Sequence, residues 1–201
     1  MKERPIIFSG PMVRAILEGR KTQDRRVVKP QPSVVHGVHS DASITTNLCF
    51  RLGDQRIHCP YGRPGDLLWV RETWRAFEPD RVRFGGRGAM SGLMMRVYAN
   101  PPIEGESIIE YRADHPKASG WKSSAQMPRW ASRITLEVTD VRVQRVQEIS
   151  ERDATAEGFN PITRDCKVPK FRELWDSTNA KRAPWASNPW VWAITFRELV
   201  A

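Results

Sequence analysis

The sequence has few cysteines and no long apolar run, and each shortage excludes a class of protein. Three cysteines in 201 residues are too few, and odd in number, for a disulfide framework, so we expect reduced thiols. No stretch approaches the roughly 18–20 consecutive apolar residues of a membrane helix. The N-terminus leads into a short apolar run without a signal region or cleavage site. The sequence therefore predicts a soluble, cytoplasmic protein without a membrane partner.

Acidic residues are also outnumbered. The chain has 23 aspartates and glutamates against 32 lysines and arginines, which gives a formal net charge of +9. Such an excess speeds encounters with polyanions, chiefly nucleic acid, and arginine forks suit phosphate better than lysine does. The alternative is a generally basic surface that keeps the protein soluble. Charge alone does not decide between the two.

Short apolar strands and short capped helices alternate along the chain and predict an α+β fold. Pro11 opens a helix that Gly19 closes, and Ser150 and Asp153 match a capping box at the start of another helix, which ends at Gly158. The apolar periods place strands at 6–8, 22–28, 67–70, 134–146 and 190–196, with the last of them central, and helices at 11–19, 150–158 and 170–178.

Two stretches interrupt this order, at about 29–58 and 78–128. Both are rich in proline, glycine and polar residues without a clear period, so we expect irregular insertions in one domain that spans residues 1–201. The second insertion holds short strand candidates at 93–98 and 107–111. Its glycine-rich run at 85–88 has neither the spacing of a dinucleotide site nor that of a P-loop, and we interpret it as a flap over a cleft.

The chemistry of the chain is concentrated in the segment that follows the first helix. Gly19 is followed within seven residues by Lys21, Asp24 and Arg26. A lysine beside an acid and an arginine can hold a phosphate or a carbonyl while the acid orients a water or the lysine. Surface ion pairs are the plainer explanation of the same residues. Glu157, in the last turn of its predicted helix, meets the negative end of the helix dipole, so burial there would raise its pKa.

These residues carry a family resemblance. The pattern Gly19-x-Lys21-x-x-Asp24-x-Arg26 resembles the G-x-K-x-x-E-x-R signature of ASCH domains, a branch of the PUA-like superfamily. The stretches 59–74, 127–133 and 188–192 are similar to the longer ASCH-type proteins of bacteriophages and prophages. The resemblance implies a small, mixed, PUA-like β-barrel with short capped helices and two irregular insertions.

The resemblance also implies a range of functions. PUA-like domains generally bind RNA or a modified base, some ASCH proteins are ribonucleases, and one branch hydrolyses N4-acetylcytidine with a lysine, a threonine and a glutamate. Matched residue by residue, the lysine is Lys21 and the glutamate is Glu157, whereas Asp24 stands at the threonine position. We therefore expect a hydrolase of RNA or of a modified nucleobase. Lys21 would stabilise negative charge, Asp24 would orient Lys21 or a water, and Glu157 would be the general acid or base.

Further side chains are candidates for contact with a nucleic acid, with RNA favoured over DNA. Arginines near the motif would hold the phosphate backbone, and a tryptophan in a polar context would stack on a base. The candidates are Arg20, Arg25, Arg26, Arg71 and Trp74, with Trp121, Trp130 and Trp185 as other possible stacking rings. Two alternatives stay open: a binding module without catalysis, and a phage accessory protein. The sequence does not determine the oligomeric state.

No cofactor or metal is expected. His36, His39 and the His58–Cys59 pair invite a zinc interpretation, but they lack the spaced cysteine and histidine pairs of structural zinc sites. Ordinary loop and core roles explain these residues.

Overall fold

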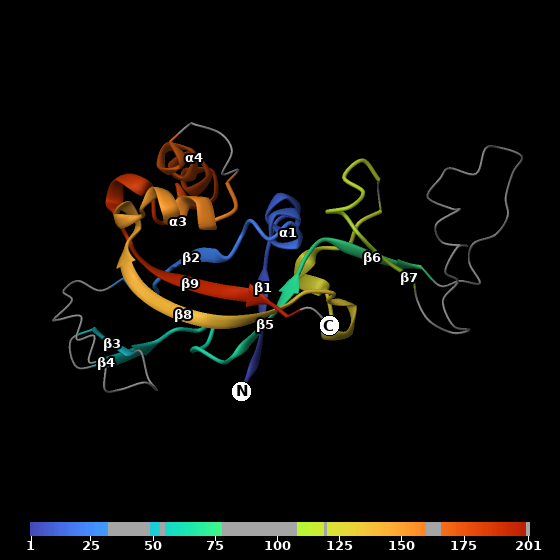
Figure 1. Ribbon diagram of the computed structural model, residues 1–201, viewed down its shortest axis with the longest axis horizontal. Helices are drawn as coiled ribbons and strands as arrows, with labels where there is room; N and C mark the ends of the chain where they lie inside the picture. Colours follow the sequence, from blue (N-terminus) through green and yellow to red (C-terminus); the bar gives the residue numbers. More distant parts are fainter. Residues whose placement is uncertain (32–48, 53–54, 78–107, 119, 160–165, 200–201) are drawn as a thin grey trace, which may run out of the picture.

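A five-stranded sheet forms the centre of the structure, a computed structural model that describes residues 1–31, 49–52, 55–77, 108–118, 120–159 and 166–199 (Figure 1). The strand order is β1-β5-β8-β9-β2, in which β1 and β5 run parallel and the other neighbours antiparallel. The strands are β1 (Glu3–Ile7), β2 (Gln23–Val27), β5 (Leu67–Arg71), β8 (Thr135–Arg145) and β9 (Trp190–Glu198). The expected central position of the last strand is confirmed.

The main core lies between one face of this sheet and helix α1 (Gly10–Leu17). Strand side chains alternate between the two faces of a sheet, so every second residue of β1, β5 and β8 can enter the core. Val13 and Ile16 of α1 pack on these strand residues. The buried strand residues of this cluster include Ile6, Leu68, Val70, Leu136, Val138, Val141, Trp192, Ile194 and Phe196.

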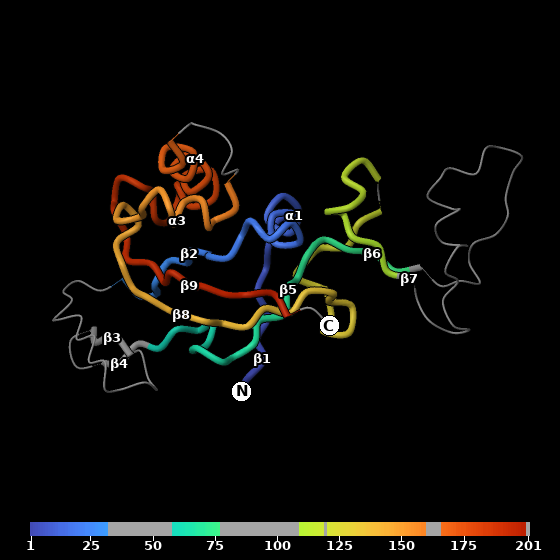
Figure 2. The backbone as a smooth tube through the Cα atoms, in the orientation of Figure 1, coloured from blue at the N-terminus to red at the C-terminus, as the bar shows by residue number. Residues whose placement is uncertain are grey.

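Two further helices, α3 (Glu151–Ala156) and α4 (Lys167–Asn179), pack together at the end of the sheet where β2 and β9 lie (Figure 1). Their contact is a second apolar cluster in which Phe171 and Trp175 of α4 meet Val191 of β9. Ser150 caps α3 through the Asp153 amide, as its sequence predicts. Figure 2 shows that β2, from the N-terminal part, runs beside β9, from the C-terminal part.

Two hairpins lie away from the sheet and fall inside the predicted insertions or beside them. The first pairs β3 (Cys49–Leu52) with β4 (Gln55–His58), and the second pairs β6 (Trp74–Phe77) with β7 (Ile108–Tyr111). Strand β7 confirms the candidate at 107–111. The candidate at 93–98 and the glycine-rich flap lie outside the described residues, as do His36 and His39.

The α+β class is confirmed, and the closed barrel is not shown. Within the described residues, β1 and β2 are the two edges of the sheet, and no ladder joins them. The Arg26 guanidinium instead donates to the Ile7 carbonyl oxygen across this gap, at 2.8 Å. No helix in the part of the chain that the structure describes is long and apolar enough to span a membrane.

Asp66 fixes the start of β5 to the start of β1. Its buried carboxylate accepts hydrogen bonds from the Lys2 amide at 2.9 Å, the Arg4 guanidinium at 3.0 Å and the Arg63 amide at 3.3 Å. Burial alone would raise the pKa of Asp66, but these donors outweigh burial and lower it. Asp66 therefore stabilises the fold in its ionised form.

An Asp66→Asn variant should lose about 2 kcal/mol of the free energy of unfolding at pH 7, because an amide accepts fewer of these bonds. A lowered folded pKa means that the contribution is present above the unfolded pKa of about 4 and is lost as the pH falls through the lower folded value. Urea unfolding at pH 7 and at pH 3 should show the difference from wild type shrinking. Glu198→Gln, at an exposed position, is the control, and an equal loss in both variants would contradict the role of Asp66.

Candidate functional site

The motif segment turns sharply between helix α1 and strand β2. Gly19 follows the helix with a φ of 70°, in the left-handed region that favours glycine. The amides of Arg20 and Lys21 then both donate to the carbonyl oxygen of Ala15, at 2.8 and 2.9 Å. This turn points the Lys21 side chain inward and starts β2 at Gln23.

Glu157 reaches the same place from the other end of the chain. It is the C-cap of α3, as expected, and forms an isolated antiparallel bridge with Lys21, while the Thr22 amide donates to the Ala156 carbonyl oxygen at 2.8 Å. Gly158 follows with a φ of 104° and packs directly on Ala15 and Lys21. The fold thus joins two residues that lie 136 positions apart in the sequence.

Lys21 is the centre of the cluster, and its side chain is 0% exposed. The ammonium nitrogen lies 2.8 Å from Glu157 Oε2 and 3.0 Å from Asp24 Oδ1. It also donates to the carbonyl oxygens of Gln23 at 2.8 Å and of Glu157 at 3.3 Å. The Phe8 ring lies 5.4 Å away. Four oxygens therefore surround an ammonium that has three protons to donate.

Asp24 is held by two cations. Its second oxygen accepts from Arg26 Nε at 2.6 Å, and the Arg26 guanidinium lies over the rings of Phe8 and Tyr61 at 5.5 and 5.7 Å. The Arg26 side chain is 29% exposed, so it reaches the surface, whereas those of Lys21 and Asp24 are buried.

Arg25 corrects a prediction. We expected it to contact a nucleic-acid backbone, but its side chain is 0% exposed and lies inside the cluster. The guanidinium donates to Glu157 Oε1 at 2.9 Å and to the Gln23 side-chain oxygen at 2.6 Å, and lies 3.2 Å from Asp153. Successive strand residues face opposite sides, so Arg25 faces α3 and α4 while its neighbours Asp24 and Arg26 face β1.

The two buried carboxylates respond differently to this environment. Burial alone would raise the pKa of Asp24, but the charges of Lys21 and Arg26 outweigh burial and lower it. Burial raises the pKa of Glu157, and the nearby Asp24 charge adds to this against the opposing effect of Lys21 and Arg25. Burial alone would lower the pKa of Lys21, but the two carboxylates raise it, so Lys21 stays an ammonium. The site contains one strongly ionised acid and one acid that protonates more easily.

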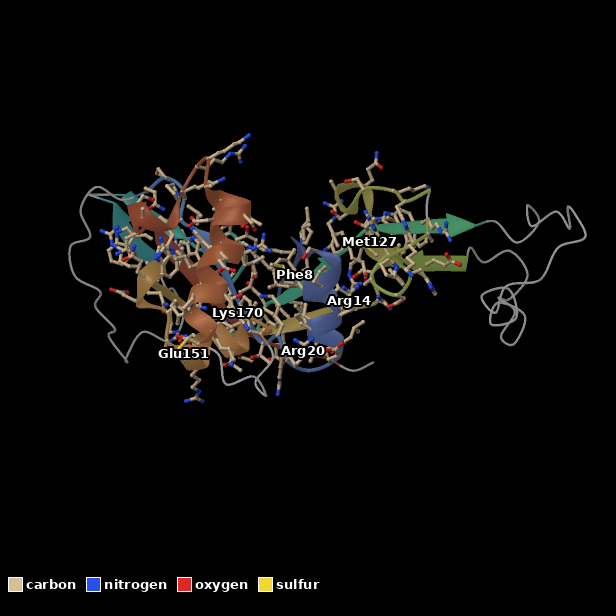
Figure 3. All side chains as sticks on the ribbon, turned by 90° about the horizontal axis from the view of Figure 1, so that it is seen from above. Phe8, Arg14, Arg20, Met127, Glu151 and Lys170 are labelled. Atoms are coloured by element: carbon tan, nitrogen blue, oxygen red, sulfur yellow. The ribbon has the colours of Figure 1, made fainter. Side chains whose placement is uncertain are left out.

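Two other arginines that we predicted to contact a nucleic acid, Arg20 and Arg71, make different contacts in the structure. Arg20, beside the end of α1 in Figure 3, is partly exposed and donates to Glu18 and to the Gly158 carbonyl oxygen. Arg71, at the end of β5, donates to the Met127 carbonyl oxygen at 3.0 Å and lies over the Trp69 ring. In Figure 3, Met127 lies on the opposite side of Phe8 from Lys170 of α4. Arg20 therefore contacts the Gly158 end of the cluster, whereas the Arg71 side chain contacts Met127 and Trp69.

Trp74 corrects a second prediction. Its ring is 4% exposed and packs with Met127 and Ala131 in a third apolar cluster, edge-on to Trp130 at 5.9 Å. The tryptophan belongs to the core beneath β6 and offers no open face to a base. Polar neighbours in the sequence had suggested exposure, but Met127, Ala131 and Lys122 pack on this ring. Trp130 is the exposed ring of the pair.

Sequence reasoning missed two residues of the cluster, Gln23 and Asp153. Gln23 is buried. Its side-chain oxygen accepts a hydrogen bond from Arg25, and its side-chain nitrogen donates one to the Thr195 hydroxyl. Asp153 lies one helical turn before Glu157, and this four-residue spacing was the available signal. No group of three or more histidine, cysteine or acidic side chains fit for a metal lies within the described residues. Burial raises the pKa of the Cys59 thiol to about 11, so it stays protonated.

Fold and site together define a small α+β domain with a buried ionic cluster of lysine, arginine, aspartate and glutamate. No family model matches the sequence, and no curated protein matches it. Among solved structures, the chain is similar to a protein of Enterococcus faecalis V583 that carries the family description DUF984. The TM-score is 0.44 and the identity 8%, over 99% of this chain and 81% of that chain. A likeness at this level carries no inference about the function of this chain.

Proposed function

We propose that this chain is a nucleic-acid-directed protein of the ASCH type, with a PUA-like fold and with RNA as the favoured partner. We further propose that it hydrolyses RNA or a modified nucleobase at Lys21, Asp24 and Glu157. The motif resemblance and the net charge of +9 support the nucleic-acid partner. The chemistry of the buried cluster supports hydrolysis.

One observation carries the hydrolase proposal: two carboxylates share the Lys21 ammonium, and their pKa values move in opposite directions. Environments that separate the pKa values of paired acids are typical of acid–base catalysis. Glu157, with the raised pKa, would take a proton from the attacking water and return it to the leaving group. Asp24, held ionised, would orient Lys21 and the water.

Lys21 would neutralise the negative charge that develops on the substrate. The longest of its four contacts, 3.3 Å to the Glu157 carbonyl oxygen, is the one that a substrate oxygen would replace. Arg26, partly exposed beside Asp24, would hold a phosphate as substrate approaches. With Asp24 at the threonine position, a water rather than a side-chain alcohol would be the nucleophile.

A second candidate is a module that binds nucleic acid without hydrolysing it. The observation that favours it is the enclosure of Lys21, whose side chain is 0% exposed and whose protons already meet protein oxygens. In this case the cluster is a framework that joins β2 to α3, and the ligand contacts only the surface around it. An accessory role in phage assembly is the remaining alternative.

Glu157→Gln tests the hydrolase proposal, because glutamine keeps the shape of the side chain and removes its proton exchange. Turnover of labelled single-stranded RNA, single-stranded DNA or N4-acetylcytidine should fall about 10²-fold. Glu173→Gln, at an exposed position of α4, is the matched control and should keep full activity. Circular dichroism would show that both variants fold.

The outcomes separate the candidates. Turnover retained by Glu157→Gln would exclude Glu157 as the acid or base. If the wild type turns over none of these substrates but binds RNA with a steep salt dependence, the binding module is supported instead. Neither turnover nor binding would leave the accessory role.

A further inference from the structure

A polar hollow of about 480 Å³ lies between helix α3 and the sheet, beside the buried cluster. Arg142 of β8, Thr195 of β9, and Ser150, Arg152 and Asp153 at the start of α3 contribute to its wall. This volume is within the range of small-molecule sites. Among the described residues that line it, Ala156 is the one with an apolar side chain, and the others carry polar or charged groups.

The buried side of the hollow offers hydrogen-bond donors. Gln23 is 4% exposed, and its amide is oriented by Arg25 at one end and by Thr195 Oγ1 at the other. One amide N–H is left to donate. The hydroxyl oxygens of Thr195 and Ser150 accept from Gln23 Nε2 and from the Asp153 amide, so their own protons can also be donated.

Two guanidinium groups complete this donor set. Arg152 is exposed and forms no ion pair with any residue that the structure describes. Arg142 lies 3.3 Å from Asp140 and 3.4 Å from Asp153. Asp153 is the one acid among the described residues of the wall, and Arg25 and Arg142 both pair with it. The hollow therefore fits a ligand that is anionic and rich in hydrogen-bond acceptors.

We infer that this hollow binds one phosphate–sugar unit of a nucleic-acid backbone, an inference that rests on the proposed function. Arg142 and Arg152 hold the phosphate, and Gln23, Ser150 and Thr195 donate to phosphate and sugar oxygens. No aromatic side chain of the described residues lines the hollow, so it lacks the stacking surface that base recognition on single strands uses. The contact is therefore independent of sequence.

The test compares wild type with an Arg142→Ala/Arg152→Ala variant in binding to single-stranded DNA and 2′-O-methyl RNA, as oligo-A and oligo-U, between 50 and 200 mM salt. The variant should bind all four probes more weakly by the same factor. Its slope of log affinity against log salt should be shallower by about 0.7, because one phosphate is no longer neutralised. Arg112→Ala, at an exposed position after β7, is the control and should match wild type.

Each other outcome has one meaning. If the wild type binds the probes and the double variant binds them with the same affinity and slope, the hollow is not a nucleic-acid site. The proposed function would then still stand. Loss confined to oligo-A or oligo-U would overturn backbone recognition in favour of base recognition. If the wild type binds none of the four probes, the nucleic-acid partner of the proposed function is excluded, and the inference fails with it.

Discussion

A Lys21→Met variant should lose about 4 kcal/mol of the free energy of unfolding at pH 7. Methionine keeps the length of the side chain but leaves Asp24 and Glu157 without the ammonium that lies 3.0 and 2.8 Å from them. Removing one partner from a buried ion pair leaves an uncompensated charge in the interior, which costs far more than the pair itself contributes. Urea unfolding at 25 °C, followed by circular dichroism, measures the loss.

The loss should depend on pH in a defined direction. The lowered pKa of Asp24 means that its contribution exists above the unfolded pKa of about 4 and disappears as the pH falls through the lower folded value. The difference between wild type and Lys21→Met should therefore be largest near pH 7 and shrink below about pH 4.

Arg197→Met is the matched control for Lys21. It breaks the exposed pair between Arg197 and Glu137, which lie 2.6 Å apart. The change should cost less than about 1 kcal/mol, because solvent screens such pairs. Equal losses in the two variants would mean that the buried ion pairs of Lys21 contribute no more to the free energy of unfolding than an exposed pair does.

Gly158→Ala should cost a similar amount, about 4 kcal/mol, from two causes that add. The φ of 104° is strained for any residue with a side chain. A Cβ at this position would also lie 2.9 Å from Ala15 Cβ and 3.1 Å from Lys21 Cβ, so α1 and the cluster would have to move. The thermal midpoint should fall by roughly 8–16 °C, and scanning calorimetry would measure it.

Gly19→Ala separates these two causes. Gly19 also has a positive φ, of 70°, but nothing lies within 4 Å of an added Cβ. This variant should lose only about 1 kcal/mol, the cost of the left-handed backbone. If both variants lose the same amount, the close approach of Gly158 to Lys21 does not matter for stability.

The sequence predicted the elements of the sheet well because their signals are local. Alternation and apolar runs located β5, β8 and β9, and a proline and a glycine bracketed α1. Helix α4 begins at Lys167, three residues before its predicted start. The reason is not local: the carboxylate of Glu151, on α3, accepts from the amides of Lys167 and Val168 and so satisfies the first turn.

The sequence predicted which residues form the candidate site better than it predicted which side chains are buried around it. The motif and the resemblance named Lys21, Asp24 and Glu157, and the structure brings these three together. The burial of Arg25 could not be read from the sequence, since it depends on the packing of α3 and α4 over the edge of the sheet. The burial of Trp74 depends in the same way on residues 127–131, more than 50 positions away.

The position of β2 at the edge of the sheet has a consequence for synthesis of the chain. Among the described strands β2 pairs with β9, which leaves the ribosome after all the others. Until then both edges of the motif strand are unpaired, and other chains could join them. Its residues Gln23, Asp24, Arg25 and Arg26 are polar or charged, so the side chains that later form the buried cluster also keep the nascent chain from aggregating.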